Sequence, residues 1–69
     1  MKELIKQLRG ELGLSQSQFA SATSSAQPTV SNWERGDRVP TKAQFREILI
    51  LAGPNPILAG QLTVAWIDA

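Results

Sequence analysis

The chain has 69 residues, with seven basic and six acidic side chains for a net charge of +1, and it contains neither cysteine nor histidine. Their absence excludes disulfides, the usual zinc sites, and catalysis that relies on a thiol or an imidazole. A chain of this length is expected to form a single domain, residues 1–69, that depends on its apolar core and on any self-association for stability.

The first predicted helix covers residues 2–12. Apolar residues repeat there at helical spacing: Leu4, Ile5, Leu8 and Leu12. Gly13 is suited to the left-handed position that follows a helix, and Leu14 is the apolar residue that a Schellman ending prefers.

A second, short helix is predicted to begin at Gln16 and to end near Thr23. Ser15 and Gln18 form the S-x-x-Q pattern of a capping box, in which each side chain binds a backbone N–H of the other residue. Phe19 and Ala20 are expected to point inward.

The third predicted helix follows a turn at residues 24–26 and ends at Gly36. Pro28 has no N–H to donate, so a helix start at Ala26 or Gln27 places it in the first turn, where none is needed. The expected buried face holds Val30 and Trp33, with Ala26 as a further candidate. Polar side chains lie away from this face: Gln27, Ser31 and Asn32.

The fourth helix is predicted to begin at Lys42, because Thr41 and Gln44 repeat the capping box. Its expected inner face consists of Phe45, Ile48, Leu49 and Ala52. Gly53 is expected to end it.

Residues 55–69 are predicted to form a fifth helix, since Asn55 is a good N-cap and Pro56 a good first helical residue. Alternating apolar residues near the end of the chain are also compatible with a strand, but the specific start signals favour the helix. Apolar residues lie on two sides of this segment. One set is either additional core or a dimer interface, and we favour the interface: Ile57, Val64, Trp66 and Ile67.

Charge is distributed unevenly along the chain. The twenty-two residues between Glu11 and Glu34 carry none, and four of the seven basic residues follow between Arg35 and Arg46. The longest apolar run is far shorter than the ~20 residues of a membrane span, and charges interrupt the apolar residues of the N-terminus, unlike in a signal peptide. We therefore expect a cytoplasmic protein with a neutral polar surface beside a cluster of cations.

The segments LGLSQSQFA (12–20) and VSNWERG (30–36), followed by Pro40, closely resemble the Cro/cI-type helix-turn-helix proteins of the XRE family. The resemblance covers residues 4–52. It implies an all-α fold, a compact five-helix bundle of the lambda-repressor type, in which the third helix enters the major groove of DNA. Amide and hydroxyl groups read base edges there, and cations meet the phosphates.

Individual roles follow from the resemblance, position by position. The base-reading positions are Gln27, Pro28, Thr29, Ser31 and Asn32. The positions expected at phosphates are Ser15, Gln16, Arg35, Arg38, Lys42 and Arg46, and Gln16 also resembles a glutamine that braces a residue of the recognition helix. Arg9 and Glu34 match a structural ion pair.

The chain departs from the family pattern at the turn. Ser24 occupies a position that usually has glycine, so it must adopt a left-handed conformation at some cost. Thr23 stands where leucine or valine is common, and Ser25 where the family has an apolar residue. Pro28 replaces what is often a hydrogen-bonding side chain.

The resemblance implies a sequence-specific regulator that binds double-stranded DNA at a pseudo-palindromic operator, as a homodimer, and represses by occupying it, nucleoid-associated when bound. The alternative is an antitoxin or interaction module that also binds its operator. No cofactor, metal, membrane or small-molecule ligand is indicated. The residues provide no enzyme signature, because the carboxylates are unpaired and no glycine-rich phosphate loop occurs.

Overall fold

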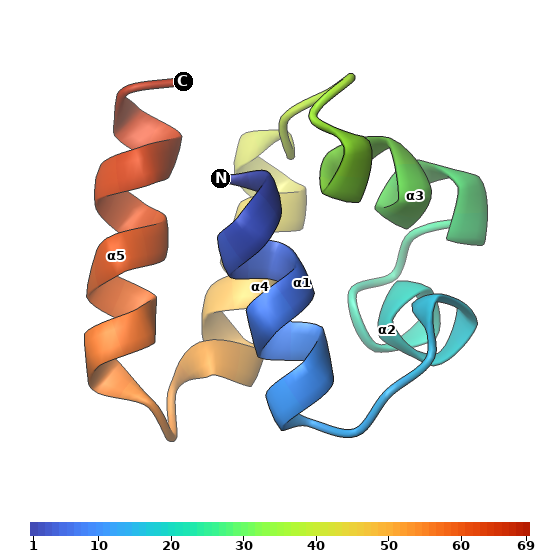
Figure 1. Ribbon diagram of the computed structural model, residues 1–69, viewed down its shortest axis with the longest axis horizontal. Coiled ribbons are helices and arrows are strands. Elements are labelled where there is room, and N and C mark those ends of the chain that lie inside the picture. The colour runs from blue at the N-terminus through green and yellow to red at the C-terminus, as the bar shows by residue number, and fades with distance from the viewer.

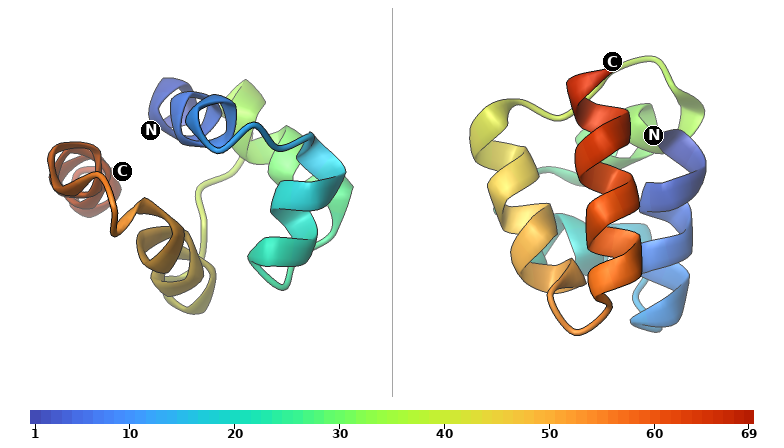
Figure 2. Two further views of the ribbon diagram at one scale, coloured as in Figure 1. Left: turned by 90° about the horizontal axis from the view of Figure 1, so that it is seen from below. Right: turned by 90° about the vertical axis from the view of Figure 1, so that its left-hand side faces the viewer.

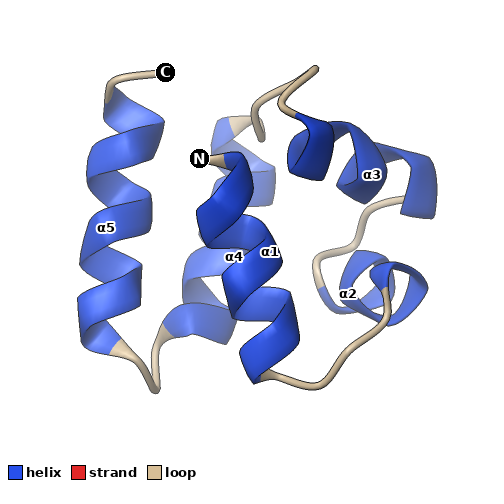
Figure 3. Cartoon of the chain, viewed as in Figure 1, coloured by secondary structure: helices blue, strands red, loops and turns tan.

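A computed structural model describes all residues, 1–69, and contains five helices and no strand (Figures 1 and 3). The helices are α1 (Lys2–Glu11), α2 (Gln16–Ala22), α3 (Gln27–Arg35), α4 (Lys42–Ala52) and α5 (Pro56–Ile67). The all-α, five-helix prediction is confirmed. None of the helices combines the length and apolar character that crossing a bilayer requires.

α2 and α3 lie on one side of the helical bundle and α5 on the other (Figure 2). α2 packs against α3, α1 contacts both α3 and α5, and α4 packs against α5. Figure 2 shows α5 lying beside α1 and α4, on the side of the molecule opposite α2 and α3. This arrangement leaves the outer faces of α3 and α5 free on different sides of the domain.

A single core joins all five helices. It consists of Ile5, Leu8, Phe19, Ala20, Val30, Trp33, Phe45, Ile48, Ala52, Leu58 and Leu62. The predicted inward positions of α2, α3 and α4 are thus confirmed for Phe19, Trp33 and Phe45, among others. Ala26, the further candidate for the buried face of α3, is exposed, because it is the N-cap residue of that helix. Leu12, which follows α1, is also exposed.

The helix ends follow the local sequence signals closely. Gly13 is left-handed, with φ 67°. The N–H of Leu14 donates to the carbonyl of Arg9 at 3.1 Å, which is the long bond of a Schellman ending. Both predicted capping boxes form, at Ser15 and at Thr41.

Residues 56–67 are helical, so the strand alternative for the end of the chain is wrong. The side chain of Asn55 accepts a hydrogen bond from the N–H of Leu58, and Pro56 is the first helical residue. These start signals outweigh the short apolar alternation, since a strand at this edge would have no neighbouring strand with which to pair.

Candidate nucleic-acid interface

The turn between α2 and α3 is held together by backbone and hydroxyl bonds. The N–H of Ser25 donates to the carbonyl of Ala20 at 2.8 Å, and the hydroxyl of Thr23 donates to the carbonyl of Phe19 at 2.9 Å. Thr23 is buried where the family commonly has leucine or valine. Its hydroxyl is tolerated there because it makes a hydrogen bond. These bonds order the turn through which α2 leads into α3.

Ser24 completes this turn in the left-handed conformation, with φ 55°, and it is the only non-glycine residue with positive φ. A residue with a Cβ pays about 1–2 kcal/mol to adopt the left-handed conformation. Glycine avoids this strain, but part of the gain is offset because glycine loses more conformational entropy on folding.

Ser24→Gly should therefore raise the free energy of unfolding by about 0.5–1 kcal/mol, measured by urea denaturation. Ser25→Gly is the matched control: its φ is not positive and its hydroxyl donates to the carbonyl of Thr23, so it should destabilise. Equal effects of the two substitutions would contradict a strained Ser24.

The sequence of α3 gives it two different faces. Val30, Trp33 and Glu34 are buried against the body of the domain. The helix begins without a side-chain cap, has Pro28 in its first turn, and ends at Gly36, whose φ of 80° suits glycine. The five predicted base-reading residues, Gln27, Pro28, Thr29, Ser31 and Asn32, are all exposed or half-buried on the remaining surface.

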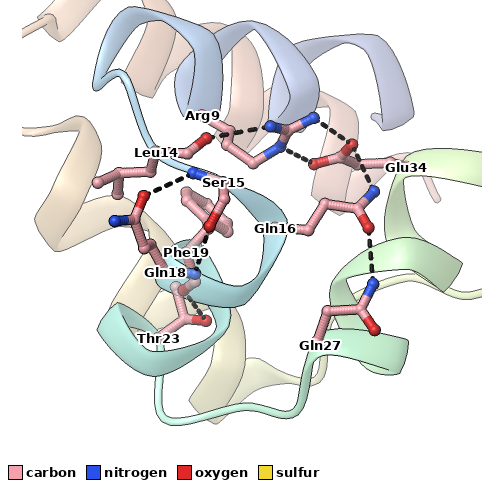
Figure 4. Close-up of polar contacts among 9 residues, drawn as sticks. All are labelled: Arg9, Leu14, Ser15, Gln16, Gln18, Phe19, Thr23, Gln27 and Glu34. Carbon is pink, nitrogen blue, oxygen red and sulfur yellow. Dashed lines mark hydrogen bonds and ion pairs between the residues drawn. The ribbon is translucent and has the colours of Figure 1, made fainter.

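The predicted ion pair between α1 and the end of α3 is present (Figure 4). The guanidinium of Arg9 donates through Nε to Oε2 of Glu34 at 2.6 Å and through Nη2 to Oε1 at 3.0 Å. Its Nη1 donates to the carbonyl of Leu14 at 3.0 Å. The side chain of Glu34 is 3% exposed and that of Arg9 23%, so the pair is largely shielded from solvent.

Two glutamines extend this ion pair toward the outer face of α3. Nε2 of Gln16 donates to Oε1 of Glu34 at 3.1 Å, and Nε2 of Gln27 donates to Oε1 of Gln16 at 2.8 Å. Figure 4 shows the resulting chain from Arg9 to Gln27. Gln27 is thereby held at a defined position relative to α1 before any partner arrives.

Glu34 carries a lowered pKa. Burial alone favours its neutral form and raises the pKa, but the hydrogen bonds from Arg9 and Gln16 and the positive charges of Arg9 and Lys6 outweigh burial. The same bond to Glu34 is the main reason that the pKa of Arg9 is raised.

The lowered pKa predicts a loss of stability in acid. The contribution of Glu34 is present above its ordinary pKa of 4.5 and disappears as the pH falls through the lower folded value. We expect the free energy of unfolding to decline below about pH 4.5, and the decline to be shallower in Glu34→Gln. Thermal melts between pH 7 and pH 3 measure both. An identical pH dependence in the two proteins would contradict it.

The predicted cations Arg35, Arg38, Lys42 and Arg46 are all exposed. A mostly polar hollow of about 320 Å³ brings Arg38 together with Thr29 and Asn32 of α3. Thr41 and Gln44, the capping residues of α4, line the same hollow, and the sequence indicated no role for them beyond capping. Ser15, also predicted at a phosphate, is exposed at the start of α2.

Arg35 is engaged within the chain, which the sequence did not indicate. Its guanidinium donates to Asp37, to Ser31 and to Asn32. Asp37 was not among the predicted residues, because nothing in a sequence shows that the turn at Gly36 brings it back beside Arg35.

The four predicted interface residues of α5 differ in their surroundings. Ile57, Val64 and Ile67 are 76%, 61% and 69% exposed. Trp66 is half-buried within its own chain: its ring stacks on Phe45 with centroids 4.8 Å apart, and Nε1 donates to the carbonyl of Pro40 at 2.9 Å. Trp66 thus fastens the loop that follows α3, and most of the free apolar surface belongs to the other three.

Comparison with known proteins identifies the family. No curated protein and no solved structure matches the chain. The sequence pattern of the helix-turn-helix family matches residues 5–51, which span α1 to α4 and include the α2–turn–α3 unit described above. The chain therefore belongs to the helix-turn-helix family of DNA-binding regulators, of the XRE or Cro type.

Proposed function

We propose that this DNA-binding regulator is a repressor that acts by occupying its operator. The observation that carries the proposal is the outer face of α3: a row of uncharged polar side chains, one of them held in place through Gln16, beside exposed cations. Neutral amides and hydroxyls suit base edges, whereas cations suit phosphates. A protein seated in the major groove over a promoter excludes other proteins from the same DNA.

The proposed division of labour follows the two kinds of side chain. Gln27, Pro28, Thr29, Ser31 and Asn32 face the base edges. Ser15, Gln16, Arg35, Arg38, Lys42 and Arg46 meet the phosphates on either side. Pro28 offers an apolar contact for a thymine methyl group, which is the apolar feature of the major groove.

We also propose that two copies bind together, with residues 55–69 of the single domain as the dimerisation segment. On the exposed side of α5, the side chains of Ile57, Val64 and Ile67 leave most of their apolar surface uncovered by the chain. Burying such residues on a second copy is favourable by about 25 cal/mol per Å². In a dimer of this class the two recognition helices lie about 34–36 Å apart, which requires a pseudo-palindromic operator.

The double substitution Ile57→Glu with Val64→Glu should convert a dimer to a monomer in sedimentation while the helical circular dichroism is kept. Ile50→Glu is the control, because Ile50 is also exposed but lies on α4. A double variant that still sediments as a dimer would contradict this interface. A monomeric wild type would favour the alternative that the face binds a different protein, as in an antitoxin.

Selection of bound duplexes from a random DNA pool tests the proposed function. We expect an enriched motif with two related half-sites about one helical turn apart. Affinity for that motif should fall with salt, with a log–log slope of about −0.9 per phosphate contacted. Recovery of no motif at low salt would overturn the proposal.

A further inference from the structure

Arg35 binds three side-chain oxygens at the end of α3. Its Nε donates to Oδ2 of Asp37 at 2.9 Å, its Nη1 to Oγ of Ser31 at 2.9 Å, and its Nη2 to Oδ1 of Asn32 at 2.5 Å. Ser31 and Asn32 are two of the proposed base-reading residues. The side chain of one cation therefore contacts two of the proposed readers, and we call this arrangement the Arg35 clamp.

The local fold places the clamp. Gly36 turns the chain in the left-handed conformation, and the N–H of Asp37 then donates to the carbonyl of Asn32 at 3.0 Å. This bond returns Asp37 to the end of α3, where its carboxylate holds Nε of Arg35. The side chains of Arg35 and Asp37 are 59% and 60% exposed, so an isolated pair between them would contribute little to stability. What the pair does is orient the guanidinium of Arg35.

The chemistry of the guanidinium fixes the direction of the Asn32 amide. Arginine has five N–H donors and no acceptor, so it can bind an asparagine only through Oδ1. Because Oδ1 is turned toward Arg35, the part of the Asn32 amide left to face the groove is Nδ2, which carries two donors. The hydroxyl of Ser31 likewise accepts from Arg35 and keeps its own O–H as a donor. Both clamped readers therefore present donors.

Gln27 differs from the clamped residues. It uses one N–H to bind Gln16, and its Oε1 has no partner within the chain, so it keeps an acceptor beside a second donor. An amide in that state matches adenine, which shows an acceptor at N7 and a donor at N6. An amide that turns only its NH₂ group to the base matches guanine, which shows acceptors at both N7 and O6.

We propose that Arg35 is a positioning residue that sets base preference: it turns Asn32 so that the facing base is read as guanine, against the adenine that a free asparagine reads. The inference rests on the proposed role of Asn32 as a base reader. Arg35 would thus position Asn32 in addition to making its proposed phosphate contact. Lysine cannot replace it in this role, because one ammonium group cannot reach all three oxygens as the planar fork of a guanidinium does.

Selection from random duplexes by four proteins tests the inference: the wild type, Asn32→Ala, Arg35→Lys and, as a control on the exposed surface of α1, Gln7→Ala. The base pair whose preference disappears in Asn32→Ala is the one that Asn32 reads. There we expect the wild type to favour guanine over adenine by about 5-fold or more, the lower end for a good side-chain–base pairing. Arg35→Lys keeps the charge and should bring this ratio to one or below. Gln7→Ala should leave it unchanged.

The outcomes separate the two levels of the proposal. If Asn32→Ala alters no base preference, Asn32 is not a reader, and its assignment under the proposed function fails together with the clamp. If Asn32→Ala alters one position at which the wild type prefers adenine, or at which Arg35→Lys changes nothing, the reader stands and the clamp alone is overturned.

A measurement without DNA tests the clamp directly. The side-chain NH₂ signals of Asn32 in the NMR spectrum of the free protein should shift in Arg35→Lys and in Asp37→Asn, and stay in place in Gln7→Ala. Signals that do not move in Arg35→Lys would overturn the clamp even if base preference changed.

Discussion

Glu34→Ala should lower the free energy of unfolding by about 3 kcal/mol, because it leaves the guanidinium of Arg9 largely shielded and without its partner. Removing one member of a buried pair costs about 3–5 kcal/mol, and the 23% exposure of Arg9 places the effect at the lower end. Folded domains are stable by only about 5–15 kcal/mol, and one this small lies low in that range. Urea denaturation at pH 7 measures the loss.

A double-mutant cycle separates the pair from its parts. Arg9→Ala leaves a carboxylate that is 3% exposed and should destabilise similarly. The double variant should lose clearly less than the sum of the two single losses, because no unpaired charge is then left behind. Glu3→Ala, on the exposed side of α1, is the control and should change stability by less than about 0.5 kcal/mol. A loss of that small size in Glu34→Ala would refute a structural role of the pair.

Gln27→Ala combined with Asn32→Ala should weaken binding to the selected duplex by about 30-fold to 10⁴-fold, since each good side-chain–base pairing contributes about 1–3 kcal/mol of discrimination. Binding to unrelated DNA depends on phosphate contacts and should change little. The free energy of unfolding should also stay nearly constant, because both residues lie on the outer face of α3. Fluorescence anisotropy with the selected and a scrambled duplex measures both affinities.

Gln7→Ala is the matched control for this double variant. It removes an exposed glutamine from α1, to which no contact with DNA or with a second copy is assigned, and should alter neither affinity. Equal losses on specific and scrambled DNA in the double variant would show that these residues act through general binding and do not read bases.

Local signals in the sequence predicted most of the fold. The capping boxes at Ser15 and Thr41, the glycine after α1 and the Asn55–Pro56 start all act over three to five residues, so their partners are visible in the sequence itself. Apolar spacing identified the inward side of each helix. Ala26 was misjudged because an alanine fits equally well in a core and at an uncapped helix start.

Contacts between distant segments were less accessible. The family resemblance indicated the pair of Arg9 and Glu34, which lie twenty-five residues apart. Neither spacing nor resemblance indicated that Trp66 would reach the carbonyl of Pro40 from another helix. The contact of Arg35 with Asp37 was equally hidden, because it depends on the direction in which Gly36 turns the chain. The contacts of Arg35 with Ser31 and Asn32 have the three- and four-residue spacing of neighbours on a helix, but many side chains with this spacing do not bind one another.

Chemical-shift mapping of the labelled protein during titration with the selected duplex tests most directly whether the outer face of α3 is the DNA-binding surface. We predict the largest chemical-shift changes in the side-chain amides of Gln16, Gln27 and Asn32 and in the backbone of residues 27–42. The signals of the outer face of α5 should change little. Changes concentrated on α1 or α5, with α3 unmoved, would contradict it.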